Sequence, residues 1–185
     1  IGADGAASLS PAARAAVEAA EVLVGGERHL GLVAAAEAER LVWPSPFDAM
    51  IDALRARRGR RVVVLATGDP LWFSVGAKIG RALPVEEIAY HPQLSAFQLA
   101  AARLGWSLAD CETVSVHGRP VESIIPFFQP GARLIALTSG ADTPARIATL
   151  MTARGYGVSR LTAFADMGTA AETRIDGTAA AWPGA

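Results

Sequence analysis

Short runs of branched apolar residues alternate with amphipathic segments along the chain, and each type predicts a different element. The apolar runs predict strands at residues 22–24, 61–66, 85–90, 113–116, 133–137 and 160–164, with a hairpin beginning at 173–175. Residues that are apolar at helical spacing predict helices at residues 11–20, 27–32, 48–58, 74–83, 96–104 and 143–153. This alternation predicts an α/β fold in two small layers joined near residue 110. We therefore expect an N-terminal domain of residues 1–110 and a C-terminal domain of residues 111–185.

The first polar loop follows the apolar run at 62–65 and reads Gly68-Asp69-Pro70. Ligands of open α/β sheets bind just beyond the carboxyl ends of the strands. Gly68 lets the backbone approach a ligand, and Asp69 accepts hydrogen bonds from amines, hydroxyls or amides. The alternative is an ordinary turn that ends a strand, since Gly, Asp and Pro are the usual turn residues.

Two further polar loops also follow apolar runs. His91-Pro92-Gln93-Leu94-Ser95-Ala96 leads into an alanine-rich helix that Ser95 is suited to cap, and Thr138-Ser139-Gly140 follows the run at 133–137. The loops after neighbouring parallel strands face one crevice, so we expect the loop at 91–96 to lie near Gly68.

Composition narrows the possible partners. Apolar residues make up 51% of the 185 residues and the net charge is −1, which disfavours both disorder and a generic nucleic-acid surface. A cluster of five arginines at 55–61 is typical of a solvated helix end, with a nucleic-acid patch as the alternative. Cys111 is the single cysteine, which excludes an internal disulfide and fits a cytoplasmic protein. No apolar run is long enough to span a membrane.

Several catalytic motifs are missing from the sequence. It contains no Gly-x-Ser-x-Gly elbow, no His-Glu-x-x-His or paired-cysteine metal spacing, and no glycine-rich loop preceding the single lysine, Lys78. We therefore expect no metal site. Loops built from small residues bind through backbone groups and shape, which suits a cofactor that brings its own reactivity.

The chain resembles the tetrapyrrole (corrin/porphyrin) methylase family, the class III S-adenosylmethionine methyltransferases. The family-wide signals are Gly68-Asp69-Pro70-Leu71, His91 to Ala96 and Leu137-Thr138-Ser139. The resemblance covers essentially the whole chain, and phrases typical of a branch that acts on late precorrins are Leu9–Arg14, Gly25–Leu30, Trp43–Phe47, Ser95–Phe97, Ala100–Trp106 and His117–Pro120. Residues 1–5 resemble the end of a strand and its glycine turn, so we expect the strand to begin before Ile1.

The resemblance implies two α/β domains with S-adenosylmethionine between them, in a homodimer. The residues implied to contact this cofactor are Gly68, Asp69, Leu71, Ser95, Ala96, Leu137, Thr138, Ala165 and Met167. Two positions depart from the family pattern: Thr138 stands where relatives often have methionine, and Gln93-Leu94 replaces a smaller or glycine-rich form.

The implied reaction is C-methylation at a meso carbon, carbon 5, of precorrin-6Y or its decarboxylated derivative in cobalamin biosynthesis. S-adenosylhomocysteine would be the product of the cofactor, and a C-terminal decarboxylating methyltransferase domain would be a partner, fused or separate. His117 is the candidate general base, with an ordinary backbone hydrogen bond as its alternative role. Arg28 and Arg119 are candidate clamps for substrate carboxylates, or else surface arginines. The alternatives to this function are methylation at another ring carbon, ribosomal RNA methylation, and a non-catalytic nucleotide-binding module.

Overall fold

The computed structural model describes residues 1–2, 4–34, 37–44, 46 and 48–183. They form two compact units, Ile1–Ser95 and Ala96–Ala185. The division falls earlier than the boundary expected near residue 110, because helix α5 (Ala96–Leu104) buries Phe97 against Ile135 of the second unit. Ser45 and Phe47, which belong to a phrase that carries the family resemblance, lie outside the described residues.

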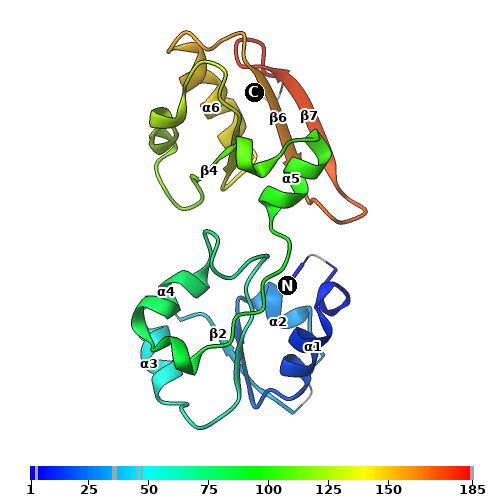
Figure 1. The fold of residues 1–185 in the computed structure, drawn as a ribbon, viewed down its shortest axis with the longest axis vertical. Coiled ribbons are helices and arrows are strands. Elements are labelled where there is room, and N and C mark those ends of the chain that lie inside the picture. Colours follow the sequence, from blue (N-terminus) through cyan, green and yellow to red (C-terminus); the bar gives the residue numbers. More distant parts are fainter. Residues whose placement is uncertain (3, 35–36, 45, 47, 184–185) are drawn as a thin grey trace. The chain divides into compact units, whose positions relative to one another are not determined.

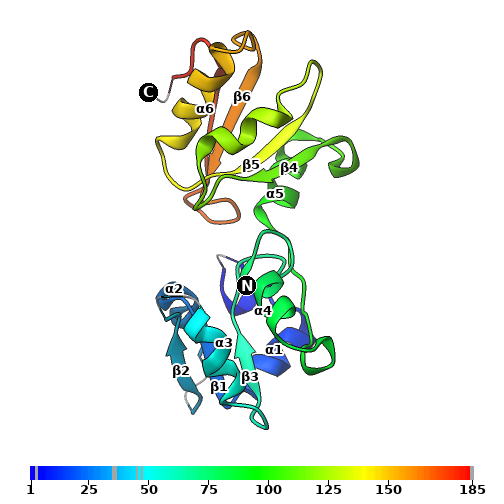
Figure 2. The ribbon, with the colours of Figure 1, turned by 90° about the vertical axis from the view of Figure 1, so that its left-hand side faces the viewer.

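A parallel three-stranded sheet forms the centre of the first unit (Figure 2). Strand β1 (Val22–Gly25) lies in the middle and pairs with β2 (Glu39–Val42) on one side and β3 (Val62–Val64) on the other. All four residues of β1 are buried, as a central parallel strand covered on both faces requires. Strand β3 is half-buried, so the expectation of a fully buried strand before Gly68 fits β1 and not β3.

Helices cover both faces of this sheet (Figure 1). On the face that carries Leu23, α1 (Pro11–Glu18) and α2 (Glu27–Gly31) contribute Val17 and Leu30 to the core. The side chain of Ser10 accepts a hydrogen bond from the amide of Ala13, which begins α1 where the Ser-Pro pair predicts it.

Val22 and Val24 point to the opposite face, because side chains alternate along a strand. There α3 (Asp48–Arg55) and α4 (Val75–Ala82) bury Met50, Leu54 and Ile79. The predicted helices are thus confirmed, and α3 ends at Arg55, three residues before the predicted end at residue 58.

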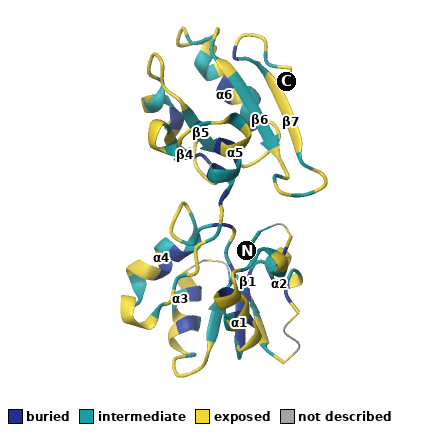
Figure 3. Ribbon diagram, turned by 45° about the vertical axis from the view of Figure 1, so that its right-hand side comes forward, coloured by how far each residue is buried: buried dark blue, intermediate teal, exposed yellow. Residues whose placement is uncertain are grey.

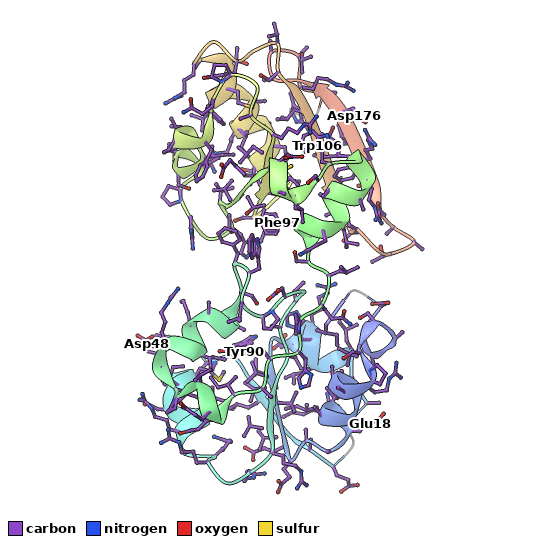
Figure 4. All side chains as sticks on the ribbon, viewed as in Figure 1. Glu18, Asp48, Tyr90, Phe97, Trp106 and Asp176 are labelled. Carbon is purple, nitrogen blue, oxygen red and sulfur yellow. The ribbon has the colours of Figure 1, made fainter. Side chains whose placement is uncertain are left out.

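Two predictions for the first unit are wrong. Residues 85–90 do not form a strand: Val85–Glu87 is a short 3-10 helix, followed by irregular chain in which Tyr90 packs along α4 (Figure 4). The local strand tendency is overridden because Val85 is 68% exposed and Glu87 is held by Arg58 at 2.8 Å. Strand β2 was not expected, since its charged, exposed residues carry no buried-strand signal.

The second unit has a parallel pair of strands between two helical layers. Strands β4 (Glu112–Ser115) and β5 (Leu134–Leu137) pair in register. One face packs on the 3-10 helix Val121–Phe127 and on α6 (Thr143–Thr152), and the other packs on α5. The sequence did not predict this 3-10 helix.

An antiparallel hairpin completes the second unit, as the sequence predicts. Strand β6 (Arg160–Ala165) pairs with β7 (Thr173–Thr178), and β7 is exposed along most of its length (Figure 3). Two short 3-10 helices, Ala6–Ser8 and Leu108–Asp110, lie outside these layers. No helix within the described residues is long and apolar enough to cross a membrane.

Candidate functional site

The carboxyl ends of the three parallel strands bring three sequence segments to one edge of the first unit. Gly25 accepts a backbone hydrogen bond from the amide of Trp43, at 3.1 Å, which joins the ends of β1 and β2. A Cβ atom on Gly26 would lie 3.3 Å from the Trp43 ring. The loop that begins at Thr67 continues from β3 to the same edge, where open α/β sheets bind their ligands.

Gly68 lies against the second predicted loop. Its backbone is left-handed, with φ 63°, and a Cβ atom there would lie 2.7 Å from Cα of Ser95. Only glycine permits both the conformation and the contact. The prediction that the loop at 91–96 lies near Gly68 is therefore confirmed, although the strand expected before that loop is absent.

The turn after Gly68 is closed by local contacts. Oδ1 of Asp69 accepts a hydrogen bond from the amide of Leu71 at 2.8 Å, an Asx turn. A Cβ on Gly76 would clash with the carbonyl of Pro70, so this part of the turn lies directly on α4. Asp69 therefore has one oxygen engaged by the turn and can use its other lone pairs for a ligand.

Three consecutive apolar side chains in this turn are partly exposed to solvent. Leu71 is 51% exposed, Trp72 is 49% exposed and Phe73 is 41% exposed. The two aromatic rings meet edge to face, with centroids 6.2 Å apart. Phe73 has φ 50°, a conformation that a bulky residue rarely adopts and that occurs mainly at functional sites.

His29 contacts the same loop, and sequence reasoning missed this role. Its Nε2 lies 2.7 Å from Oγ1 of Thr67, the residue before Gly68. Burial, followed by the charge of Arg28, holds the pKa of His29 below its usual value. The Gly-Gly-Glu-Arg-His phrase supported only the family resemblance, although a histidine one turn into a helix after a strand was a usable signal.

The ends of β4 and β5 are joined in the second unit. Nδ1 of His117 donates to the carbonyl of Thr138 at 3.2 Å, and Oγ of Ser139 accepts from the amide of Gly118 at 2.9 Å. A carbonyl only accepts, so Nδ1 carries the proton and Nε2 of the neutral ring keeps a free lone pair. His117 thus makes the backbone bond of its alternative role and still presents a basic nitrogen.

The remaining predicted cofactor residues of this unit follow its strands. Leu137 ends β5, and Thr138 accepts the histidine bond. Ala165 ends β6, and Met167 packs against the cluster that includes Phe97. The structure therefore puts these residues at strand ends, and their role toward a cofactor stays a prediction.

An ion pair fixes the turn that carries Met167. Arg103 of α5 makes two hydrogen bonds to Glu172, at 2.6 and 2.7 Å, and Glu172 also accepts from the amide of Gly168. Arg103, followed by the Gly168 amide, lowers the pKa of Glu172 to about 2. The carboxylate thus ties α5 to the loop between β6 and β7.

Replacing Glu172 by Gln is expected to weaken the pH dependence of stability in acid. A carboxyl group whose pKa is lowered on folding stabilises the fold above its unfolded pKa, and this contribution disappears as the pH falls from about 4.5 to about 2. The free energy of unfolding, measured by urea denaturation across that range, should therefore fall less steeply in Glu172→Gln than in the parent. Glu122→Gln, at an exposed carboxylate of the same unit, should keep the parental slope; equal slopes for all three would contradict the role of Glu172.

The two arginines predicted to clamp carboxylates are both exposed. Arg28 lies on α2 beside His29, and Arg119 follows His117, with its backbone amide bonded to Val116. Their role as carboxylate clamps stays a prediction.

The arginine cluster at 55–61 is paired with carboxylates. Each of its five guanidinium groups forms an ion pair: Arg55 with Asp52, Arg57 and Arg60 with Glu39, Arg58 with Glu87, and Arg61 with Glu21. This arrangement is the one expected for a solvated helix end and leaves little free positive charge for a polyanion.

The chemistry of these loops is that of binding and proton transfer. Among the described residues, no group of three or more His, Cys, Asp and Glu side chains is arranged to hold a metal ion. The two strand-end regions offer backbone amides and carbonyls, one carboxylate, one basic imidazole nitrogen and exposed apolar side chains. Such groups orient a reactive cofactor and its acceptor and can remove a proton.

Comparison with known proteins identifies a family for this chain. The family described as Tetrapyrrole (Corrin/Porphyrin) Methylases matches residues 1–182. The precorrin-6Y C(5,15)-methyltransferase (decarboxylating) of Sinorhizobium sp is 44% identical over 93% of this chain and 42% of its own length. The enzyme of the same name from Mycobacterium tuberculosis is 36% identical over 98% of this chain and 46% of its own length. The chain therefore spans less than half the length of these two relatives.

A shorter relative and two solved structures are also similar. The cobalt-precorrin-7 C(5)-methyltransferase of Salmonella typhimurium is 34% identical over 80% of this chain and 73% of its own length. The crystal structure of a precorrin-6Y methylase from Archaeoglobus fulgidus has a TM-score of 0.64 at 25% identity, covering 92% of this chain and 83% of that one. A uroporphyrin-III C-methyltransferase from Thermus thermophilus has a TM-score of 0.73 at 25% identity, covering 99% and 84%.

Proposed function

The chain belongs to the tetrapyrrole methylase family, and on that premise we propose that it is an S-adenosylmethionine-dependent C-methyltransferase of cobalamin biosynthesis. The proposed reaction is methylation of carbon 5, a meso carbon, of precorrin-6Y or its decarboxylated derivative. The observation that carries the proposal is the pattern of coverage. The chain matches under half of each C(5,15) relative and 73% of the Salmonella C(5) enzyme. Of the two carbons in the longer name, carbon 5 is the one shared with the shorter relative.

The first unit has features that fit the methionine end of S-adenosylmethionine. Gly68 lets the loop lie directly against Ser95, and Asp69 offers carboxylate lone pairs to an ammonium group. Together with Leu71 and Ser95, these residues would hold the cofactor in this unit. When bound, the cofactor supplies an activated methyl group on sulfur, so the chain needs no nucleophile of its own.

The second unit would hold the rest of the cofactor through four residues at or beside its strand ends and a fifth at the start of α5: Leu137, Thr138, Ala165, Met167 and Ala96. The solved structure of a uroporphyrin-III C-methyltransferase from Thermus thermophilus in complex with S-adenosylhomocysteine shares the fold, with a TM-score of 0.69. The family and this fold support use of S-adenosylmethionine, with S-adenosylhomocysteine as the product.

His117 is the proposed general base. Its Nδ1–H is held by Thr138, which orients the ring and leaves Nε2 to accept a proton from the carbon that is methylated. Arg28 and Arg119 would bind acetate or propionate groups of the macrocycle, since a guanidinium binds a carboxylate through two parallel hydrogen bonds.

The cellular setting is also part of the proposal. A free thiol at Cys111 fits a cytoplasmic enzyme. We propose a homodimer, and we assign decarboxylation and carbon-15 methylation to the part of the longer relatives that this chain does not match.

Transfer of a labelled methyl group tests the proposed function. Incubation with methyl-¹³C S-adenosylmethionine and purified late precorrins should yield one labelled methyl per macrocycle, located at carbon 5 by carbon NMR. The uroporphyrin-III relative makes another ring carbon the second candidate, so uroporphyrinogen III belongs among the substrates. Label at any other carbon would overturn the carbon-5 assignment. Label in ribosomal RNA, or cofactor binding without transfer to any acceptor, would overturn the function as a whole.

A further inference from the structure

The glycines and the histidine of the Gly25-Gly26-Glu27-Arg28-His29 segment have no role in the reaction proposed above, yet His29 connects β1 to the Gly68 loop. A helical side chain leans toward the N-terminus of its helix, so the His29 imidazole lies back over the two glycines that precede α2. From there its Nε2 reaches Oγ1 of Thr67 at 2.7 Å. The His29 side chain thus links the carboxyl end of β1 to the loop that follows β3.

Both glycines provide the space that this imidazole occupies. A Cβ on Gly25 would lie 3.3 Å from Cβ of His29 and 3.3 Å from Cβ of Leu65. A Cβ on Gly26 would lie 3.5 Å from Nδ1 of His29, with the ring of Trp43 on its other side. The packing around His29 is therefore tightest at Gly25, where a methyl group would require His29 or Leu65 to shift by a few tenths of an ångström.

The hydrogen-bonding pattern favours one protonation state of this ring. Nδ1 is buried and has no hydrogen-bond partner among the described residues. An orphaned buried N–H is rarer than an under-satisfied acceptor, so the arrangement favours a bare Nδ1 and an Nε2–H that donates to Thr67. A neutral imidazole of this tautomer holds the threonine hydroxyl without placing a charge beneath the loop.

We propose that His29 is a positioning residue that sets the conformation of the Gly68-Asp69 loop through its hydrogen bond to Thr67, and thereby sets the affinity for the methyl donor. The proposal rests on the proposed function for the identity of the donor. The coupling between His29, Thr67 and the loop is independent of it.

Binding of S-adenosylhomocysteine by calorimetry tests the inference through paired variants. His29→Phe and Thr67→Val should each weaken binding about tenfold, because each removes the same hydrogen bond. The double variant should be no weaker than either single variant. His29→Gln, which keeps an N–H near the position of Nε2, and Thr67→Ser, which keeps the hydroxyl, should recover most of the affinity. A general loss of packing would not be rescued in this way.

A matched glycine pair checks the steric argument. Gly25→Ala, which would bring a methyl group 3.3 Å from Cβ of His29, should weaken binding, whereas Gly31→Ala at the end of α2 should not, since a Cβ there meets nothing within 4 Å. Thermal unfolding of each variant reports whether the fold is kept.

The amide NMR signal of Gly68 gives a readout without any ligand. It should shift in His29→Phe and return toward its parental position in His29→Gln. An unshifted signal together with parental binding in both His29→Phe and Thr67→Val would overturn the inference. Failure of the parent protein to bind S-adenosylhomocysteine would instead overturn the proposed function. The NMR experiment would still test whether His29 sets the conformation of the Gly68 loop.

Discussion

Gly68→Ala is expected to lower the affinity for S-adenosylmethionine at least about 100-fold and to destabilise the first unit by about 2–4 kcal/mol. Two effects combine at this position. The left-handed backbone, with φ 63°, costs an alanine about 1–2 kcal/mol, and the new methyl group would lie 2.7 Å from a backbone atom of Ser95. One of the two loops must move, and both belong to the proposed cofactor site. Calorimetry measures the affinity, and urea denaturation measures the stability.

Gly59→Ala separates the cost of the left-handed backbone from the cost of the steric clash with Ser95. Gly59 also has a left-handed backbone, with φ 85°, but a Cβ there meets no atom within 4 Å. Its replacement should therefore cost only the backbone term and leave cofactor affinity at the parental value. If both alanine variants bind the cofactor equally, the contact between Gly68 and Ser95 does not shape the cofactor site.

His117→Ala is expected to reduce kcat by about 10²- to 10⁴-fold, the usual contribution of a general base, with little change in cofactor affinity. The structure leaves Nε2 as the basic atom because Nδ1–H is engaged by Thr138. A substitution that removes only proton transfer lowers kcat and kcat/KM together. Steady-state kinetics with a late precorrin, with cofactor binding measured separately, distinguishes this pattern from a loss of binding.

The exposed His91 supplies the control for that experiment. His91→Ala removes an imidazole that lies in the loop before Ser95 but is not among the residues proposed to contact cofactor or substrate, and its kcat with saturating cofactor should match that of the parent. A parental kcat in His117→Ala would assign His117 to the backbone bond alone and remove the general base from the mechanism.

The sequence predicts the elements with buried, regular patterns and misses those set by tertiary contacts. Strand β1 and helices such as α1 and α6 follow from continuous apolar runs and from Ser-Pro or Thr-Pro starts. Strand β2 could not be predicted from the sequence pattern, because most of its residues are exposed and the strand is held by pairing with β1. The strand expected at 85–90 does not form: β3 is the edge strand of its sheet, and Val85–Glu87 adopts a 3-10 helix whose Glu87 is held by Arg58.

Some features of the candidate site could likewise be predicted from the sequence, and others could not. Glycine and proline punctuation reveals the loops at Gly68 and Thr138, because such residues mark chain reversals after strands. The contact of Gly68 with Ser95 needs only neighbouring loops, so it was predictable even though one strand was wrong. The bond from His29 to Thr67 was not, because it joins residues from different elements whose separation only the folded sheet determines.

The turn between Pro70 and Gly76 has an evolutionary consequence. Its two ends are fixed, since Gly76 accepts no side chain beneath the carbonyl of Pro70, while Leu71, Trp72 and Phe73 project outward between them. Substitutions at Leu71 and Trp72 alter the exposed chemistry without touching that contact, and glycine or asparagine at Phe73 relieves its left-handed backbone. The ends of the turn can therefore be kept while its exposed side chains change.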